Sequence, residues 1–460
     1  MKDKKWLLAL FFVFVILILI PPRLRNIQGH THTFTYESYI HLNNIPSAIN
    51  INNFNLFHFI IIVLEKAFTL NFITQALPLL FGLLSFVLFY FIVLEIKSKI
   101  NPKINRNELF LGMLFFTVSP FIIFISTAFT PYSFIMVISL SVVLLALKNR
   151  LIESSVLVAL LAFTEIFSFV IMLLFFSFYL LYMSEYRKSK SWLFLIIFPF
   201  TAFLLGLLVF NNNILNFFDP NIGIANYFSE IGSYTGFPVF LVILFILGIS
   251  VNWKRSFYFV LPHLAFFALL VISFFSPSAR LFCNLVMVFY ASSGMIYLIE
   301  RYWDFSLLKD FVISIIIFSI VFSTVFTLSS LTTEEPSIDM EKALLYLKKH
   351  SDPDYKVLSR PQNDMFIKHI AEREPALYYE YKHTKPKKYE EFYSLFDSQN
   401  IQTTSRIFDE NDIKYIIIDE KSREEIWPRP LKGLLFLLHY NEKFIKIRDF
   451  NEVELWEYNP

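Results

Sequence analysis

The chain has 460 residues, of which 56% are hydrophobic and only 17% charged, and its mean hydropathy is +0.55. Soluble proteins carry about 25% charged residues, so this composition excludes an ordinary soluble protein. The net charge of +2, without a long run of Lys or Arg, argues against nucleic acid as a partner.

The chain begins with the basic stretch Met1–Lys5, which an apolar segment over residues 6–22 follows. This layout is typical of a signal peptide, but Pro21-Pro22-Arg23 stands where a small-residue cleavage site is needed. We therefore expect an uncleaved membrane span with a cytoplasmic N-terminus.

One carboxylate stands among aromatic and histidine side chains after this span, in Thr35-Tyr36-Glu37-Ser38-Tyr39-Ile40-His41. We expect this segment within a first outer loop over residues 23–75. A carboxylate held at a partly dry interface suits a general base, whereas the simpler interpretation of Glu37 is a solvated loop side chain. The nearby His30 and His32 suggest either a metal site or ordinary surface histidines, because no strong third ligand accompanies them.

Apolar runs of roughly 17–25 residues can cross a bilayer as helices. The segment 151–184 is too long for one crossing, and we interpret it as two short helices that meet at Thr164-Glu165. With these two, the sequence predicts about eleven spans. The other nine are 6–22, 76–96, 108–125, 131–147, 191–210, 236–252, 256–275, 281–299 and 310–330.

The apolar segment 54–69 is short and contains Glu65 and Lys66, so its relation to the membrane needs a separate argument. If it lies along the interface, sixteen basic residues of the loops and termini fall inside and four fall outside, in agreement with the positive-inside rule. The four are Arg23, Arg25, Lys66 and Arg280. We therefore expect an interfacial helix over 54–69 and an extracytoplasmic C-terminal region.

Three charged residues fall near the outer ends of the predicted spans. Arg280 precedes the span 281–299 and can hold a phosphate with its planar fork of donors, although snorkelling to lipid headgroups is an equal alternative. Glu165 lies at a hairpin turn, where an ionisable side chain usually lines a cavity or has a partner. Glu230, in the outer loop 211–235, adds a further acidic group or is simply solvated.

From residue 331 onward the composition becomes charged and mixed, so we divide the chain into a transmembrane domain (1–330) and a soluble domain (331–460). Segments rich in β-branched and aromatic residues predict strands at Tyr355–Ser359, Ile413–Asp419, Phe444–Ile447 and Val453–Tyr458. Helices are predicted at Ile338–His350, Asp364–Glu372, Lys388–Asp397 and Leu431–His439. This compact α/β or α+β domain lacks a Gly-rich phosphate loop and an HExxH motif, which favours a lid or recognition role.

One span, an outer loop with an acidic motif, many further spans and an outer C-terminal domain resemble the GT-C integral-membrane glycosyltransferases. These include oligosaccharyltransferase catalytic subunits and protein O-mannosyltransferases. Tyr36–Leu42 is similar to an Asp-Ser-Tyr-Tyr-His-Leu type of motif in archaeal members. Ser229–Phe237 resembles the loop before a late span, and Ser278-Ala279-Arg280 resembles an entrance for the donor phosphate. The likeness implies a polytopic α-helical membrane protein with a GT-C-like transmembrane domain and an extracytoplasmic α/β domain.

The resemblance also implies roles for the candidate residues. Glu37 would be the acceptor-activating carboxylate, Arg280 would hold the phosphate of a polyprenyl-phosphate sugar, and Glu230 would shape the acceptor region. The other substrate-binding candidates are Tyr36, Tyr39, His41 and Glu165. A divalent metal, Mg²⁺ or Mn²⁺, is the cofactor that relatives suggest, but the next outer loop, Ser126–Pro131, has no acidic residue where relatives often carry one.

The predicted function is the transfer of a sugar, with inversion, from a polyprenyl-phosphate donor to a glycan, lipid or protein acceptor at the outer face of the cell membrane. The first alternative is a non-catalytic envelope-assembly or anchoring protein whose external domain binds a partner. The second is a transporter, which we expect to show an internal repeat and ionisable residues at mid-bilayer. The sequence shows neither.

Overall fold

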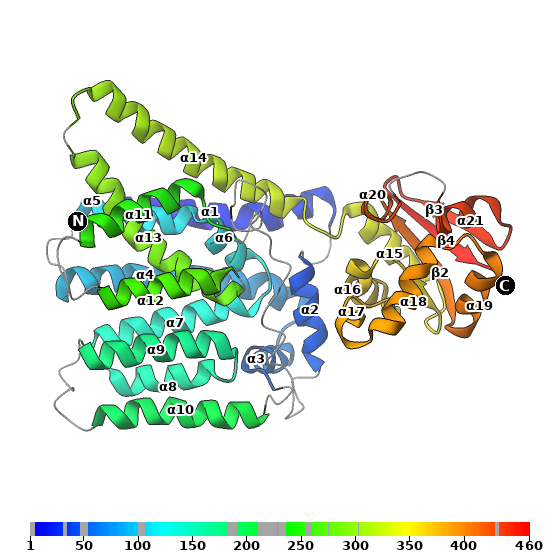
Figure 1. Ribbon diagram of the computed structural model, residues 1–460, viewed down its shortest axis with the longest axis horizontal. Coiled ribbons are helices and arrows are strands. Elements are labelled where there is room, and N and C mark those ends of the chain that lie inside the picture. Colours follow the sequence, from blue (N-terminus) through cyan, green and yellow to red (C-terminus); the bar gives the residue numbers. More distant parts are fainter. Residues whose placement is uncertain are drawn as a thin grey trace. The chain divides into compact units, whose positions relative to one another are not determined.

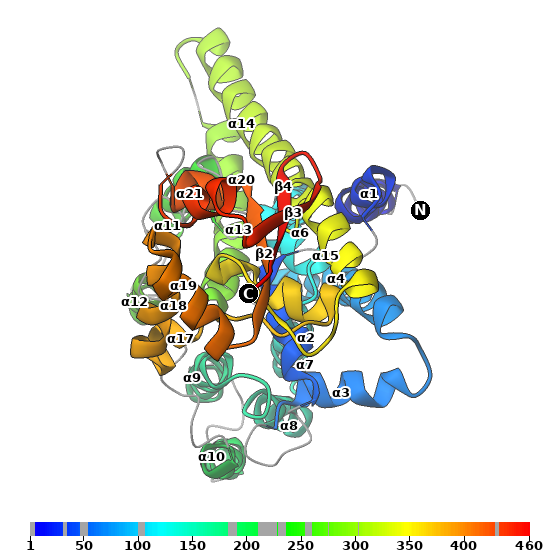
Figure 2. The same ribbon diagram turned by 90° about the vertical axis from the view of Figure 1, so that its right-hand side faces the viewer.

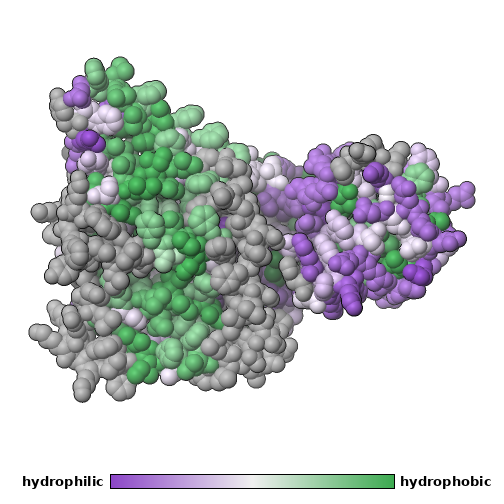
Figure 3. Space-filling view, viewed as in Figure 1, coloured by the Kyte–Doolittle hydropathy of each residue, from purple (hydrophilic) through white to green (hydrophobic). Residues whose placement is uncertain are grey.

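The computed structural model describes residues 5–30, 35–46, 54–99, 106–182, 191–209, 228, 236–253, 260–274, 276–301, 303–427 and 432–460. Its contacts divide the chain into two compact units. The helical unit consists of Met1–Leu24 and Asn44–Thr332, and the C-terminal unit consists of Arg25–Asn43 and Thr333–Pro460. Apolar side chains gather on the helical unit and polar ones on the C-terminal unit (Figure 3). The segment Arg25–Asn43, which the sequence analysis assigned to the transmembrane domain, packs with the C-terminal unit.

The helical unit is built from apolar helices, several of which run side by side (Figure 1). They are α1 (Lys5–Gln28, whose last residues belong to the C-terminal unit), α3 (Leu56–Glu65), α4 (Leu70–Lys99), α5 (Arg106–Val118), α6 (Pro120–Thr127), α7 (Pro131–Leu147), α8 (Leu151–Leu161), α9 (Ile166–Tyr182), α10 (Ser191–Val209), α11 (Val239–Trp253), α12 (Val260–Ser273), α13 (Pro277–Glu300) and α14 (Ser306–Thr332). Of the described helices, α1, α4, α13 and α14 are each long and apolar enough to cross a membrane, and α5 with α6 makes a fifth candidate. The chain is therefore a membrane protein with several helical spans, and the number eleven stays a prediction.

The predicted span 108–125 is not one straight helix, because α5 and α6 meet at an angle of 52°. Proline disfavours helical backbone in the residue before it, and Ser119 accordingly has an extended conformation (φ −66°, ψ 122°) ahead of Pro120. The Val118 carbonyl accepts a hydrogen bond from Thr324 Oγ1 at 2.9 Å, and Ser119 Oγ donates to Asn284 Oδ1 at 2.9 Å. Side chains of α13 and α14 therefore satisfy polar groups at the break, as buried backbone requires in an apolar environment.

Glycines let α11 and α13 approach closely. A Cβ atom at Gly294 would lie 2.0 Å from the Leu244 carbonyl oxygen, so any side chain there collides with backbone. We expect Gly294→Ala to destabilise the protein by about 1–3 kcal/mol or more, because helix backbones cannot move aside like a flexible side chain. Gly112→Ala is the matched control, since its Cβ would lie 3.8 Å from Ser292 Oγ. Thermal unfolding of detergent-purified variants checks this, and equal unfolding temperatures would contradict it.

The C-terminal unit contains a four-stranded mixed sheet of order β1-β2-β4-β3. The strands are β1 (Lys356–Leu358), β2 (Ile413–Asp419), β3 (Phe444–Asp449) and β4 (Val453–Tyr458). Strand β1 runs parallel to β2, whereas β4 pairs antiparallel with both β2 and β3. All four strands predicted from the sequence are present.

Helices cover both faces of this sheet, since successive strand residues point to opposite sides. Ile416 and Ile418 of β2 face a buried cluster with α18 (Pro386–Asp397) and α19 (Ile401–Glu410). Tyr415 and Ile417 face a second cluster with α15 (Ile338–His350). Figure 2 shows the strands between α15 on one side and α18 and α19 on the other. The second cluster also contains Tyr39 from the segment Arg25–Asn43.

The helical segments of the C-terminal unit are α2 (Tyr36–Asn44), α15 (Ile338–His350), η9 (Pro361–Asn363), α16 (Asp364–Phe366), the π-helix η10 (Ile367–Ala371), α17 (Tyr381–Thr384), α18 (Pro386–Asp397), α19 (Ile401–Glu410), α20 (Glu420–Glu425) and α21 (Leu434–Tyr440). Helix α15 has the predicted bounds because Ser337 caps it by accepting a hydrogen bond from the Met340 N–H at 3.2 Å. Acidic residues in its first turn and basic ones in its last also suit the helix dipole. The sequence analysis did not predict α19.

Candidate active site

Glu37 lies in the first turn of α2, within the C-terminal unit. The helix begins after Thr35, whose Oγ1 accepts a hydrogen bond from the Ser38 N–H at 3.3 Å and lies 2.9 Å from Ser38 Oγ. A carboxylate in this first turn is favoured by the helix dipole. Glu37 and His41 are both half-buried, and they are four residues apart, so they occupy neighbouring positions on one face of α2.

The two tyrosines beside Glu37 pack against the C-terminal unit itself. Tyr36 donates its hydroxyl hydrogen to Asp364 Oδ1 at 3.0 Å. Tyr39 is 1% exposed, and its ring meets that of Phe366 edge-on at 5.1 Å between centroids. The ring of Tyr379 also contacts that of Tyr36, with 6.5 Å between the centroids. One side of α2 is thus docked, and the face with Glu37 and His41 is a different one.

Buried charged groups hold the start of the segment Arg25–Asn43 in place. Arg25 is 2% exposed, and its Nη2 donates to the Pro336 carbonyl at 3.1 Å and lies 3.3 Å from His30 Nδ1. His30 Nδ1 in turn lies 2.8 Å from the buried Glu341 Oε2 of α15. Buried charges need partners, and these contacts supply them within the C-terminal unit. His30, considered above as a metal ligand or surface residue, is a buried partner of Glu341.

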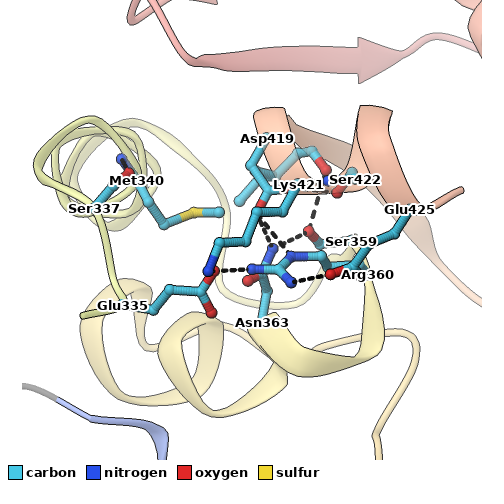
Figure 4. Close-up of polar contacts among 11 residues, drawn as sticks. Glu335, Ser337, Met340, Ser359, Arg360, Asn363, Asp419, Lys421, Ser422 and Glu425 are labelled. Atoms are coloured by element: carbon cyan, nitrogen blue, oxygen red, sulfur yellow. Dashed lines mark hydrogen bonds and ion pairs between the residues drawn. The ribbon is translucent and has the colours of Figure 1, made fainter. Parts of the chain in front are cut away.

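A second network of polar contacts joins Glu335, near the start of the segment Thr333–Pro460, to residues at the ends of β1 and β2 (Figure 4). Arg360, two residues beyond the end of β1, donates through Nε to Asp419 Oδ2 at 2.8 Å and also pairs with the Glu335 carboxylate. Lys421 Nζ lies 2.9 Å from the same Glu335 oxygen. The Glu335 carbonyl accepts the N–H of Thr35 at 3.2 Å. This network therefore fixes a backbone group that contacts the start of α2.

Glu334, the residue before Glu335 of this network, carries a carboxyl group whose pKa is shifted. Burial, the negative charge of Glu335 and, more weakly, that of Glu37 raise its pKa to about 7, against the opposing effect of Lys421 and Arg25. A carboxyl with a raised pKa binds its proton more tightly in the folded than in the unfolded chain. Stability is therefore lost as the pH rises from about 4.3, the ordinary value for Glu, through about 7.

We expect Glu334→Gln to weaken this pH dependence, because glutamine carries no charge to desolvate. The variant should unfold at a higher temperature than the wild type at pH 8, and the difference should shrink toward pH 4.5. Thermal unfolding of the full-length protein in detergent between these pH values checks the expectation. Glu442→Gln, at an exposed position of the same unit, is the control. A constant difference between Glu334→Gln and wild type across the range would contradict it.

In the helical unit, Arg280 and Glu165 lie at the ends of neighbouring elements. Ser276 caps α13 by accepting a hydrogen bond from the Ala279 N–H at 3.4 Å, and Arg280 follows in the first turn, 4% exposed. Glu165, between α8 and α9, accepts hydrogen bonds from Ser168 Oγ and Ser278 Oγ. The predicted hairpin turn is thus joined to the start of α13, two residues before Arg280. Glu165 has the partners that a carboxylate in an apolar unit requires.

The start of α3 is fixed to the same turn. The Leu56 N–H donates to the Phe163 carbonyl at 2.8 Å, and Asn55 Nδ2 donates to the Thr164 carbonyl at 2.9 Å. Asn55 also caps α3 by accepting a hydrogen bond from the Phe57 N–H at 3.0 Å. Residues far apart in the sequence therefore meet around Glu165.

The predicted site residues fall into two groups. Glu37, Tyr36, Tyr39 and His41 belong to α2 of the C-terminal unit, and Arg280 and Glu165 belong to the helical unit. Glu230 and His32 lie outside the described residues. Across the described ranges, no three His, Cys, Asp or Glu side chains are grouped so that they could hold a metal ion. We assign no step of the reaction to a metal ion.

Asp364, Arg360 and Asp419 were not among the predicted site residues. Arg360 follows β1, and Asp419 is the last residue of β2. Polar residues just beyond parallel strands meet at one edge of a sheet, so these two could have been singled out once both strands were predicted. No pattern in the sequence indicated that Asp364 would contact Tyr36, because 328 positions separate them.

No protein-family model matches the chain, and no curated protein matches it significantly. Solved structures do match. The apo form of the Archaeoglobus fulgidus oligosaccharyltransferase is similar with a TM-score of 0.61 at 13% identity, over 92% of this chain and 70% of the other. The same enzyme tethered to an acceptor peptide containing the NVT sequon gives 0.56 at 11% identity, over 91% and 70%. The archaeal oligosaccharyltransferase AglB from A. fulgidus, in complex with an inhibitory peptide and a dolichol-phosphate, gives 0.54 at 12% identity, over 91% and 70%. The chain shares the fold of these enzymes, which confirms the expected helical membrane fold with a C-terminal domain, and the side of the membrane on which that domain lies stays a prediction.

Proposed function

We propose that this chain is a membrane glycosyltransferase that moves a sugar from a polyprenyl-phosphate-linked donor to an acceptor at the outer face of the membrane. The main support is the fold, which is similar to that of an oligosaccharyltransferase over 92% of the chain. One of those structures holds an inhibitory peptide and a dolichol-phosphate, and the latter belongs to the chemical class of the leaving group proposed here. The position of Glu37 in the helix that follows the first apolar helix gives this fold a candidate base.

The proposed reaction is a displacement at the anomeric carbon. The bond from this carbon to the donor phosphate breaks, a bond to the acceptor oxygen forms on the opposite face, and polyprenyl phosphate leaves. Glu37 takes the acceptor proton, as a positioned carboxylate can do for a hydroxyl. Arg280 offers a planar fork of donors to the phosphate, where negative charge develops as the bond breaks. Inversion at the anomeric carbon follows.

The other candidates complete the proposed site. His41 shares a helix face with Glu37 and would contact the acceptor. Glu165 would orient the start of α13 through Ser278 and so the donor side. Glu230 stays a proposed contact of the acceptor region. In this scheme the N-terminus is cytoplasmic and the C-terminal unit is extracytoplasmic.

The test uses proteoliposomes that contain the full-length protein and a panel of radiolabelled polyprenyl-phosphate sugars. Glycan, lipid and peptide acceptors are offered in turn, with and without a chelator. We expect label to move from at least one donor to one acceptor class, and the chelator arm shows whether a divalent ion takes part. Absence of transfer from every donor, together with binding of an external partner by the intact protein, would favour the anchoring alternative. Movement of intact donor across the bilayer would favour a transporter.

A further inference from the structure

We infer that Asp364 is a positioning residue for Glu37, so that the C-terminal unit holds the proposed base in place. This inference rests on the proposed function. The C-terminal unit was expected to be a lid or recognition domain. The contacts of α2 point to a more direct role, since the helix that carries Glu37 is docked on this unit by the residues that flank it.

The central contact is a carboxylate shared by two segments. Asp364 is fully buried. Its Oδ1 accepts the Tyr36 hydroxyl at 3.0 Å and the Met365 N–H at 2.6 Å, and its Oδ2 accepts the Tyr379 N–H at 3.0 Å. Every partner is a donor, so both oxygens act as acceptors. Asp364 thereby ties the residue next to Glu37 to two backbone positions of the C-terminal unit.

Two further contacts restrict α2. Tyr39 is buried against Phe366, which lies two residues after Asp364. Thr35 has a left-handed conformation with φ 74°, which is strained for a β-branched residue. It keeps this conformation while its N–H donates to the Glu335 carbonyl at 3.2 Å. Strained backbone persists only where its surroundings fix it, and such sites gather near functional residues. The chain is therefore constrained on both sides of Glu37.

The chemistry of the contact predicts what its loss would do. Asn at position 364 has the same shape but one acceptor oxygen and an NH₂ group, so one of the donor partners would face another donor. Phe at position 36 removes the hydroxyl group, so Asp364 Oδ1 keeps only the Met365 N–H as a donor. Either change loosens α2 without touching Glu37. A misplacement of about 1 Å at a reacting group can lower a rate about 10²-fold.

The experiment compares Asp364→Asn, Tyr36→Phe and the double variant with wild type, as full-length proteins in proteoliposomes. We expect kcat for sugar transfer to fall roughly 10- to 100-fold in each single variant. The KM for the lipid-linked donor should change less than about twofold, because the donor phosphate is assigned to Arg280. The double variant should be no slower than the slower single variant, since both remove the same contact.

A matched pair of controls exists in the same unit. Tyr378 donates its hydroxyl to Glu374 Oε1 at 2.5 Å, a tyrosine–carboxylate bond at an exposed position outside α2. Tyr378→Phe and Glu374→Gln should leave kcat unchanged. Hydrogen–deuterium exchange over residues 36–44 gives a second readout, and we expect faster exchange there in Asp364→Asn and Tyr36→Phe only.

The outcomes separate the possible failures. Faster exchange with an unchanged kcat, or equal loss of kcat in the control pair, would overturn the positioning role. Unchanged exchange and unchanged kcat would overturn the docking itself. If the wild type transfers no sugar, the positioning role falls with the proposed function, and the exchange measurement still decides whether Asp364 holds α2.

Discussion

Glu37→Gln is expected to abolish sugar transfer while the protein still folds and inserts. Glutamine matches the shape of glutamate but cannot take the acceptor proton. Loss of a general base typically lowers the reaction rate by about 10²–10⁴-fold. Because Glu37 is half-buried on a face of α2 different from the one docked through Tyr39, the substitution leaves the packing of α2 intact. The measurement is the initial rate of label transfer in proteoliposomes at saturating donor.

The control for this variant is Glu410→Gln, which changes an exposed glutamate of the same unit. It should retain the wild-type rate. Glu37→Asp should show an intermediate rate, since it keeps a carboxylate but withdraws it by one methylene. Full activity of Glu37→Gln would refute the role of Glu37 as the base and would leave the fold similarity as the only support for a glycosyltransferase.

The C-terminal unit could be predicted largely from local patterns. Strand β2 is a run of β-branched and aromatic residues ending at Asp419, and the sequence indicates both of its ends. Helix α15 has a capping serine and a charge gradient that mark its bounds. Helix α19 carries a local signal that was not used, because Asn400 caps it by accepting hydrogen bonds from the N–H groups of Gln402 and Thr403. Packing of Ile407 and Phe408 in the cluster with β2 stabilises this helix further.

The site was less predictable, because its contacts join distant parts of the chain. The motif around Glu37 could be recognised as unusual, but its assignment to the C-terminal unit depends on Arg25, His30 and Tyr36 finding partners more than three hundred positions away. Neither the periodicity nor the composition of the sequence indicates which distant residues will pair. The resemblance implied substrate-binding roles for Tyr36 and Tyr39, and these stay predictions. The packing of both side chains within the C-terminal unit could not be read from the sequence.

The burial of Arg280 bears on its two proposed roles, which are phosphate binding and snorkelling to lipid headgroups. A snorkelling arginine keeps its charged head in water or among headgroups. Arg280 is only 4% exposed and lies in the first turn of α13, where the helix dipole adds to its positive charge. A buried arginine at a helix start is suited to an anionic partner, which supports the phosphate role as a proposal.

We therefore expect Arg280→Gln to lower kcat/KM for the lipid-linked donor by about 10²–10³-fold, the usual cost of losing one stabilising group for developing charge. Arg280→Lys should restore only part of the activity, because an ammonium keeps the charge but not the planar fork. Arg301→Gln, at the exposed far end of the same helix, should act like wild type. Competition by polyprenyl phosphate, the leaving group, should weaken in Arg280→Gln and not in Arg301→Gln. If Arg280→Gln instead bound this product as well as wild type does, the phosphate role would be wrong, because a residue that stabilises the departing phosphate must also contact it after departure.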